Sequence, residues 1–206
     1  MEVLEVAPGL WRWTAPHPDW APAEDWPREV GCTYWEGGDA VCLVDPLVPA
    51  DAAKRFHAHL DADVERAGKP VAILLTTADH ERSAAELRDR HGAEVWAWEG
   101  AERERLAVPV DRLFAAGGAL PGGVEALGAG RPEALLWLPA RRTLVAADVL
   151  VGGPLRVSPW AEDEEEQRRT LAALADAARL PVEVVLVSHG EPVLADGAAA
   201  LARALA

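Results

Sequence analysis

The chain has 206 residues, of which half are apolar and about a quarter are charged, so its composition is that of a globular protein and excludes a disordered or collagen-like chain. Its 34 acidic and 20 basic residues give a net charge of −14. Such a surface repels nucleic acids and anionic bilayers, which we therefore exclude as partners. No apolar run reaches the ~18 residues that a membrane-spanning helix needs. We expect a single domain over residues 1–206.

Hydrophobic periodicity predicts the elements along the chain. Continuous apolar runs such as 71–75 are typical of buried strands, and apolar residues at helical spacing over 50–67 predict a helix that ends at Gly68. Strands come first and then alternate with helices, which favours a layered α/β domain with helices outside. Strands are expected at 3–6, 10–14, 30–35, 40–44, 71–75, 94–98, 134–138, 143–146 and 182–187. Helices are expected at 50–67, 81–91, 160–179 and 197–206. For residues 100–133 we expect a short helix followed by loops and weak strands.

The two cysteines, Cys32 and Cys42, flank an expected turn near residues 36–39. A three-residue loop there would place them opposite each other in a hairpin. The first residues contain neither a basic segment nor a long apolar one, unlike a secretory signal. We therefore expect a reducing, cytoplasmic setting and two buried thiols rather than a disulfide.

Tryptophan is unusually frequent, with nine residues against one tyrosine and two phenylalanines. One interpretation is that these rings fill the core; the other is that Trp11, Trp13 and Trp35 also wall an apolar pocket. Residues 15–29 hold four prolines, two tryptophans and His17, and this composition predicts a long loop that covers the pocket. His17 either reaches into that pocket or faces solvent.

Acids and histidines recur just after the predicted strands. The carboxyl ends of strands are where α/β sheets place their ligands, and carboxylates with imidazoles suit zinc, iron or manganese. Each residue alone also has an ordinary structural role; an aspartate, for example, can cap a following helix. The residues are Asp45 after 40–44, Asp79 and His80 after 71–75, Asp148 after 143–146 and His189 after 182–187.

A second histidine pair, His57 and His59, looks like a metal motif but lies within the helix expected at 50–67. Side chains two residues apart on a helix point about 200° apart. We therefore do not expect these two histidines to bind one ion.

At these residues the chain resembles the metallo-β-lactamase fold superfamily. The resemblance rests on Leu43-Val44-Asp45-Pro46, on Ile73-Leu74-Leu75-Thr76 followed by Asp79-His80, on 144–150, and on Val187-Ser188-His189-Gly190. It covers nearly the whole chain, and residues 100–133 match worst. It implies an αββα sandwich, in which two mixed β-sheets lie face to face between outer helices. It also implies metal-dependent hydrolysis at one edge of that sandwich.

The chain departs from the family's metal motif, which reads Thr-His-x-His-x-Asp-His. Here the matching stretch, residues 76–80, is two residues shorter and lacks both leading histidines. The family's third histidine would fall near residues 129–132, where Gly130 stands. The family's centre holds two metal ions, and the resemblance leaves this chain with ligands for the second of these two sites only. These are Asp79, His80, Asp148 and His189, with Asp79 and His80 as catalytic residues and Asp45 in support.

Two functions follow from this depleted site. In the first, the four ligands hold one zinc or iron ion whose bound water attacks an unknown substrate, as in a mononuclear metal-dependent hydrolase. In the alternative, the chain binds no metal and is a non-catalytic binding or structural relative of the superfamily. A metal-free enzyme with His80 or His189 as its base is a third option. All of them involve a small-molecule ligand or substrate and a monomer or homodimer.

Overall fold

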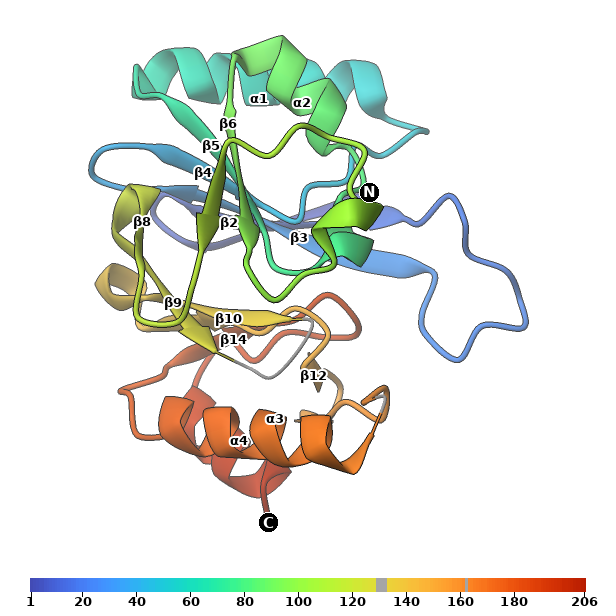
Figure 1. Cartoon of the computed structure of the whole chain (residues 1–206). Helices are drawn as coiled ribbons and strands as arrows, with labels where there is room; N and C mark the ends of the chain where they lie inside the picture. The colour runs from blue at the N-terminus through green and yellow to red at the C-terminus, as the bar shows by residue number, and fades with distance from the viewer. Residues whose placement is uncertain (129–132, 162) are drawn as a thin grey trace.

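The structure is a computed structural model that describes residues 1–128, 133–161 and 163–206. Two β-sheets lie face to face between two layers of helices (Figure 1). This arrangement confirms the expected αββα sandwich. Two helices cover the first sheet, α1 (Ala53–Ala67) and α2 (Ala84–His91), and two cover the second, α3 (Glu164–Ala177) and α4 (Gly197–Ala204).

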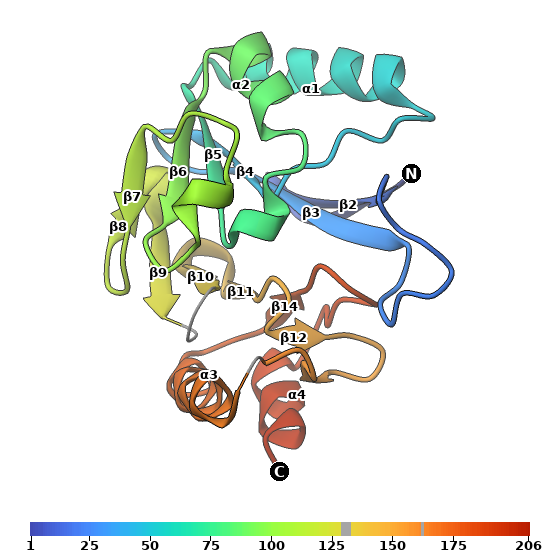
Figure 2. The ribbon, with the colours of Figure 1, turned by 45° about the vertical axis from the view of Figure 1, so that its right-hand side comes forward.

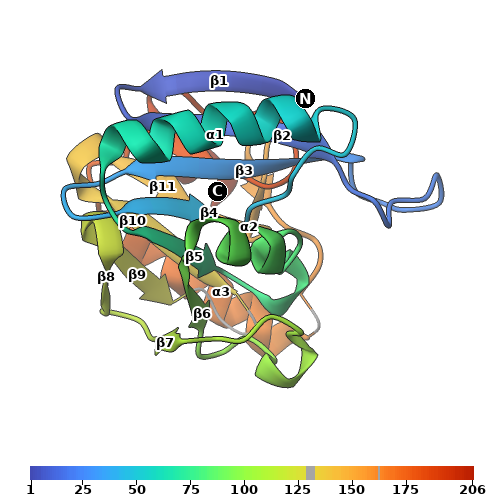
Figure 3. The ribbon, with the colours of Figure 1, turned by 90° about the horizontal axis from the view of Figure 1, so that it is seen from above.

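The first sheet is antiparallel from β1 to β4 and parallel from β4 to β7. Its strands lie in chain order: β1 (Glu2–Ala7), β2 (Leu10–Pro16), β3 (Glu29–Glu36), β4 (Val41–Val44), β5 (Val71–Leu75), β6 (Glu94–Trp98) and β7 (Arg112–Phe114). Figure 3 shows α1 lying along this sheet above β2 and β3.

The second sheet is mixed, because β14 pairs with β11 in parallel while the other neighbours are antiparallel. Its order is β14 (Val184–Leu186), β11 (Thr143–Val145), β10 (Ala134–Leu138), β9 (Val124–Gly128) and β8 (Ala119–Leu120). A separate pair joins β12 (Leu150–Val151) to β13 (Arg156–Val157). Short 3-10 helices lie at η1 (Ala78–His80), η2 (Arg103–Arg105), η3 (Pro121–Gly123) and η4 (Pro139–Arg141).

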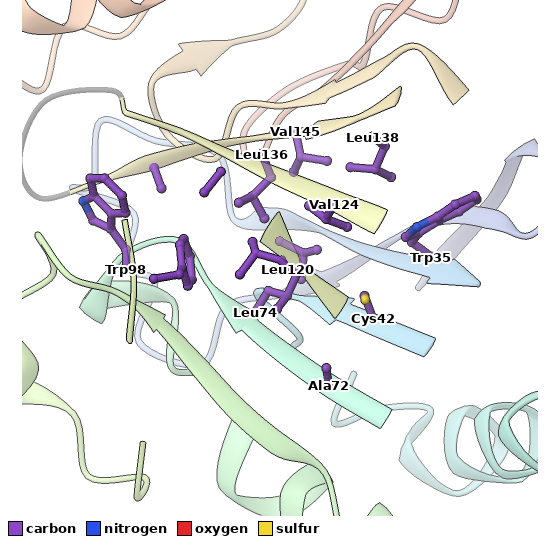
Figure 4. Packing of buried hydrophobic residues seen from close by; sticks show 14 of the residues in the cluster. Trp35, Cys42, Ala72, Leu74, Trp98, Leu120, Val124, Leu136, Leu138 and Val145 are labelled. Atoms are coloured by element: carbon purple, nitrogen blue, oxygen red, sulfur yellow. The ribbon is translucent and has the colours of Figure 1, made fainter. Parts of the chain in front are cut away.

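Three apolar cores hold the layers together. The central core fills the space between the sheets, where Leu74 from the first meets Leu136 from the second (Figure 4). A second core packs the other face of the first sheet against Phe56 and Leu60 of α1. A third core packs the second sheet against Leu174 of α3 and Leu201 of α4. Strands β4, β5 and β10 are apolar without interruption because both of their faces are buried.

Most predicted elements are found, and three strands, 71–75, 94–98 and 134–138, match to the residue. The helix expected at 160–179 is shorter at both ends: it begins after Asp163, whose side chain accepts the capping bond from the Glu166 amide, and it ends at Ala177. The strand expected at 182–187 is reduced to β14, and the helix expected at 81–91 begins only at Ala84. The pair of β12 and β13 was not expected from the sequence.

Both cysteines are buried and unbonded to each other. The expectation that they face each other across a hairpin is wrong: Cys42 pairs with Trp35, and Cys32 pairs with Trp13. The loop between the two strands spans residues 37–40, which shifts the register by three residues from the one expected. Cys42 therefore lies in the central core, whereas Cys32 lies in the core under α1.

Among the helices of residues 1–128, 133–161 and 163–206, none has the length and apolar character to cross a bilayer.

Candidate functional site

His80 is held between two carboxylates at the edge where the sheets meet. Asp45 follows β4, and its Oδ2 atom lies 2.9 Å from Nδ1 of His80 on η1. The Thr76 hydroxyl and amide also donate to Asp45, at 2.6 and 2.9 Å. The other ring nitrogen of His80, Nε2, lies 3.2 Å from Oδ2 of Asp148. Because an ionised carboxylate only accepts hydrogen bonds, this geometry favours an imidazolium that donates from both nitrogens.

Asp148 joins His80 to the second histidine. Its Oδ1 atom lies 3.3 Å from Nε2 of His189, which follows β14. The four side chains therefore form a row, Asp45–His80–Asp148–His189, in which each contacts the next. We call this row the histidine–aspartate network. It is nearly closed to solvent, since His80 is only 3% exposed and His189 only 5%.

The backbone around the network is strained. Asp45, Arg82 and Ala147 have φ angles of 48°, 43° and 43°, in the left-handed region that side chains other than glycine seldom adopt. Asp45 is itself a member of the network, Ala147 directly precedes Asp148, and Arg82 lies two residues after His80. Strain of this kind costs about 1–3 kcal/mol per residue and gathers at functional sites.

The turn that carries His189 is bound through the backbone to β3 of the first sheet and to the residue that follows β12. Gly31 on β3 donates to the Ser188 carbonyl at 2.7 Å, and Gly152 donates to the His189 carbonyl at 2.9 Å. The buried guanidinium of Arg12 on β2 donates to the Gly190 carbonyl at 3.0 Å. The position of His189 therefore depends on these close backbone contacts.

We expect Gly152→Ala to displace the His189 turn. A Cβ atom at this position would lie 1.9 Å from the Glu191 carbonyl oxygen, so the two backbones must separate. Overpacking of this kind costs about 1–3 kcal/mol, which urea unfolding would measure. Gly38→Ala is the matched control, because nothing lies within 4 Å of its Cβ position. Equal stability of the two variants would contradict this description of the turn.

Two tryptophans cover His189. The rings of Trp26 and Trp160 lie 5.3 and 5.2 Å from the His189 ring, centre to centre. Trp26 belongs to the segment 17–28 between β2 and β3, which we call the flap and which Figure 2 shows projecting from the ends of these strands. A hydrogen bond fixes the position of the flap: the indole of Trp160 donates to Asp25 at 3.0 Å. It thus covers the network and separates His189 from solvent.

The network shifts the pKa values of His80 and Asp148 in opposite directions. Burial and the neighbouring Arg82 disfavour a protonated His80, but Asp148 and Asp45 outweigh them and raise its pKa to about 9. Burial disfavours an ionised Asp148, but His80 and His189 outweigh it and hold the pKa of Asp148 well below its usual range. At neutral pH the network therefore contains a cationic His80 in contact with an anionic Asp148.

The other residues singled out from the sequence lie apart from the network. Asp79 points outward, is 55% exposed on its side chain and pairs with Arg105. His17 lies in the flap against Trp26, with ring centres 5.3 Å apart. Trp35 belongs to the central core, where its indole donates to the Gly122 carbonyl (Figure 4). Trp11 and Trp13 line a cavity beneath α1. Gly130 lies outside the described residues.

Three residues of the site were not assigned to it from the sequence. Thr76 bonds Asp45, and Arg82 donates to the Asp45 carbonyl oxygen at 2.9 Å. Glu133, directly before β10, has a buried carboxylate oxygen, and burial followed by the charge of Asp148 raises its pKa to about 8. Thr76 and Arg82 lie on either side of the Asp79-His80 motif in the sequence, and this proximity to the motif is the signal by which they could have been assigned to the site. Glu133 precedes its strand, so a search of strand carboxyl ends misses it.

The described residues do not fit a metal centre as they are arranged. Both ring nitrogens of His80 face carboxylates, and the two oxygens of Asp148 face different histidines. Over 1–128, 133–161 and 163–206, no group of three or more His, Cys, Asp or Glu residues is placed to hold an ion.

The sequence matches no protein-family model and no curated protein. The fold, by contrast, is similar to solved structures over nearly its full length. It resembles FIM-1 from Pseudomonas aeruginosa, solved in a mono-zinc form, with a TM-score of 0.71, 15% identity and coverage of 99% of this chain and 94% of that one. A metallo-β-lactamase from Pontibacter korlensis gives 0.70, 16% identity and coverage of 99% and 98%.

A third similar structure is a metallo-β-lactamase family protein from Thermus thermophilus, with a TM-score of 0.66, 22% identity and coverage of 97% of this chain and 79% of that one. The chain therefore has the metallo-β-lactamase fold.

Proposed function

We propose that this chain is a metal-free, non-catalytic variant of the metallo-β-lactamase fold that binds a small molecule. In this proposal the charge of protonated His80 stands where a metallo-enzyme of this fold would hold its ion. The chain keeps the fold and the flap but uses them for binding instead of hydrolysis.

The observation that carries the proposal is the contact of both His80 nitrogens with carboxylates, at 2.9 and 3.2 Å. A metal binds one neutral imidazole nitrogen while the other ring nitrogen commonly donates to a carboxylate. Here Nε2, the nitrogen that would be left for an ion, instead faces Asp148. Asp45 and Asp148 thus receive from His80 the positive charge that an ion would supply. A buried carboxylate without such a partner would be strongly destabilising.

The binding role is supported by a cavity of about 730 Å³ between the flap and the first sheet. Its volume is that of a small-molecule site. Its walls combine charged groups of both signs, Arg28 and Arg82 with Asp19 and Asp79, with the aromatic surface of Trp20. Arg82 also donates to the backbone of Asp45, which connects the cavity to the network.

One observation favours the mononuclear metal-dependent hydrolase as the competing function. Within the described residues, the buried Nδ1 atom of His189 has no hydrogen-bond partner. Buried polar atoms are rarely left without partners. A zinc or iron ion at Asp148 and His189 would require His80 to lose its proton, and the two functions therefore differ in metal uptake.

Metal analysis separates the two functions. We expect protein grown in zinc- and iron-supplemented medium and then dialysed to retain neither metal, because both nitrogens of His80 are occupied. A chelator should also leave its melting temperature unchanged, since no bound ion contributes to stability. Inductively coupled plasma mass spectrometry and thermal unfolding measure these two quantities.

Two variants make the outcome clear. His189→Ala removes a network residue, and His57→Ala removes a histidine that bonds Glu86 on the helical surface. One equivalent of zinc or iron per chain, lost in His189→Ala and kept in His57→Ala, would contradict the proposal and support the hydrolase.

A further inference from the structure

A second cavity, distinct from the network and the flap, lies between α1 and the first sheet. It has a volume of about 440 Å³, within the range of small-molecule sites. Its walls are mainly apolar and include Trp11, Trp13, Phe56, Leu60 and Val3. We refer to it as the α1 cavity.

A buried hydroxyl lines the α1 cavity. Tyr34 is 6% exposed, and its hydroxyl oxygen lies near the charged groups of Arg66 and Asp63 but, over the described residues, makes no hydrogen bond of normal geometry. An unsatisfied buried polar group costs about 1–3 kcal/mol. A ligand that offers a hydrogen-bonding group at this point would remove that cost.

The α1 side of the cavity carries the guanidinium of Arg55. Arg55 and His59 line it from α1, and neither forms an ion pair within residues 1–128, 133–161 and 163–206. Asp63, one turn beyond His59, is already paired with Arg66 at 3.3 Å. The mouth near Arg55 therefore complements a negatively charged group.

The first turn of α1 strengthens this preference for an anion. Its N-cap residue, Ala52, provides no side-chain cap, and no acidic residue lies in the first turn. The amides at a helix N-terminus attract anions when no side chain occupies them. Lys54 and Arg55 line an adjoining hollow of about 690 Å³ here, with Asp51 as its one acid among the lining residues. Figure 3 shows the chain's N-terminus beside this end of α1.

We propose that the α1 cavity binds a flat apolar carboxylate with a hydrogen-bonding group at its far end. The carboxylate lies at Arg55 and the first turn of α1, the apolar body lies between the tryptophans and Phe56, and the far group bonds the Tyr34 hydroxyl. Arg55 and Asp63 are eight residues apart on α1, a rise of about 12 Å, which suits a two-ring aromatic acid.

Isothermal titration with three related probes tests this proposal. 6-Hydroxy-2-naphthoate carries both polar ends, 2-naphthoate lacks the hydroxyl and 2-naphthol lacks the carboxylate. We expect 6-hydroxy-2-naphthoate to bind most tightly. Tyr34→Phe should weaken it about fivefold, the value of one hydrogen bond, and leave 2-naphthoate unchanged.

Arg55→Gln should weaken both acids about tenfold, as expected for a charged hydrogen bond, and leave 2-naphthol unchanged. Arg179→Gln is the matched control, because Arg179 is an exposed residue paired with Asp176 after α3. Val3→Trp fills the cavity from an exposed position on the edge strand and should abolish binding of all three probes.

The absence of saturable binding to the unmodified chain, or equal binding to Val3→Trp, would overturn the proposal. Sedimentation velocity examines the competing occupant, a second copy of the chain. A dimer that Val3→Trp dissociates would also overturn the proposal, since it would assign the α1 cavity to self-association.

Discussion

Replacing Asp148 with asparagine is expected to lower the free energy of unfolding by about 3 kcal/mol. Asp148 contacts both histidines of the network. Asparagine keeps the shape but removes the charge, so a buried cationic His80 loses one of its two carboxylate partners. Urea unfolding measured by circular dichroism provides the free energy.

Asp79→Asn is the matched control for this substitution. Asp79 is exposed and paired with Arg105 at the surface, where ion pairs contribute about 0–1 kcal/mol. The two aspartates thus undergo the same chemical change in opposite environments. An equal loss of unfolding free energy in the two variants would contradict the account of the network. A larger loss in Asp79→Asn would indicate that Asp79 belongs to the site.

The stability of the chain is expected to fall as the pH rises from about 6.5 to 9. The pKa of His80 is raised from 6.5 in the unfolded chain to about 9 in the fold. A raised pKa contributes stability that is complete below the unfolded value and is lost as the pH passes the folded one. A difference of about 2.5 units corresponds to about 3 kcal/mol. Urea unfolding between pH 6 and 9.5 measures the loss.

Glu133 adds to this trend in a lower pH range. Its pKa is raised from 4.5 to about 8, so the fold binds its proton more tightly and loses stability from about pH 4.5 to 8. Glu133→Gln should remove that part and keep the fall between about pH 6.5 and 9 that His80 causes, while His80→Gln should remove the fall above pH 8. A flat profile in the unmodified chain, or an unchanged fall in His80→Gln, would contradict these assignments.

The sequence predicted the layers of the fold because burial leaves a local signature. Strands β5 and β10 are continuous apolar runs between polar ends, and their bounds follow directly. The ends of α1 and α2 were equally visible, since Gly68 and Gly92 adopt the left-handed conformation that stops a helix. Such features depend on a few neighbouring residues and can be seen without the tertiary structure.

The candidate site was predictable only in part, because its contacts join distant parts of the chain. Asp45, His80, Asp148 and His189 were found by their position after strands, and the structure brings these four together. Asp79 was included with them, but η1 turns adjacent side chains to different sides, so His80 faces inward and Asp79 outward. The direction of each side chain in such a short turn depends on its tertiary partners.

The tryptophans show the same limit. Trp11 and Trp13 alternate along β2 and share a face, yet the sequence did not show which helix covers that face. The contact of Trp160 with His189 joins a loop before α3 to a turn after β14, and no local pattern marks it. Contacts between layers are set by the packing of whole sheets, which the sequence does not state residue by residue.

Nitrogen-15 NMR of the imidazole rings tests the central claim most directly, because it reports the protonation of each ring nitrogen. At pH 7.5, with one equivalent of zinc added, we expect His80 to keep protons on both Nδ1 and Nε2 and its signals to stay in place. A neutral His80 ring, or signals that shift to metal-bound values on addition of zinc, would contradict the claim that this histidine takes the place of an ion.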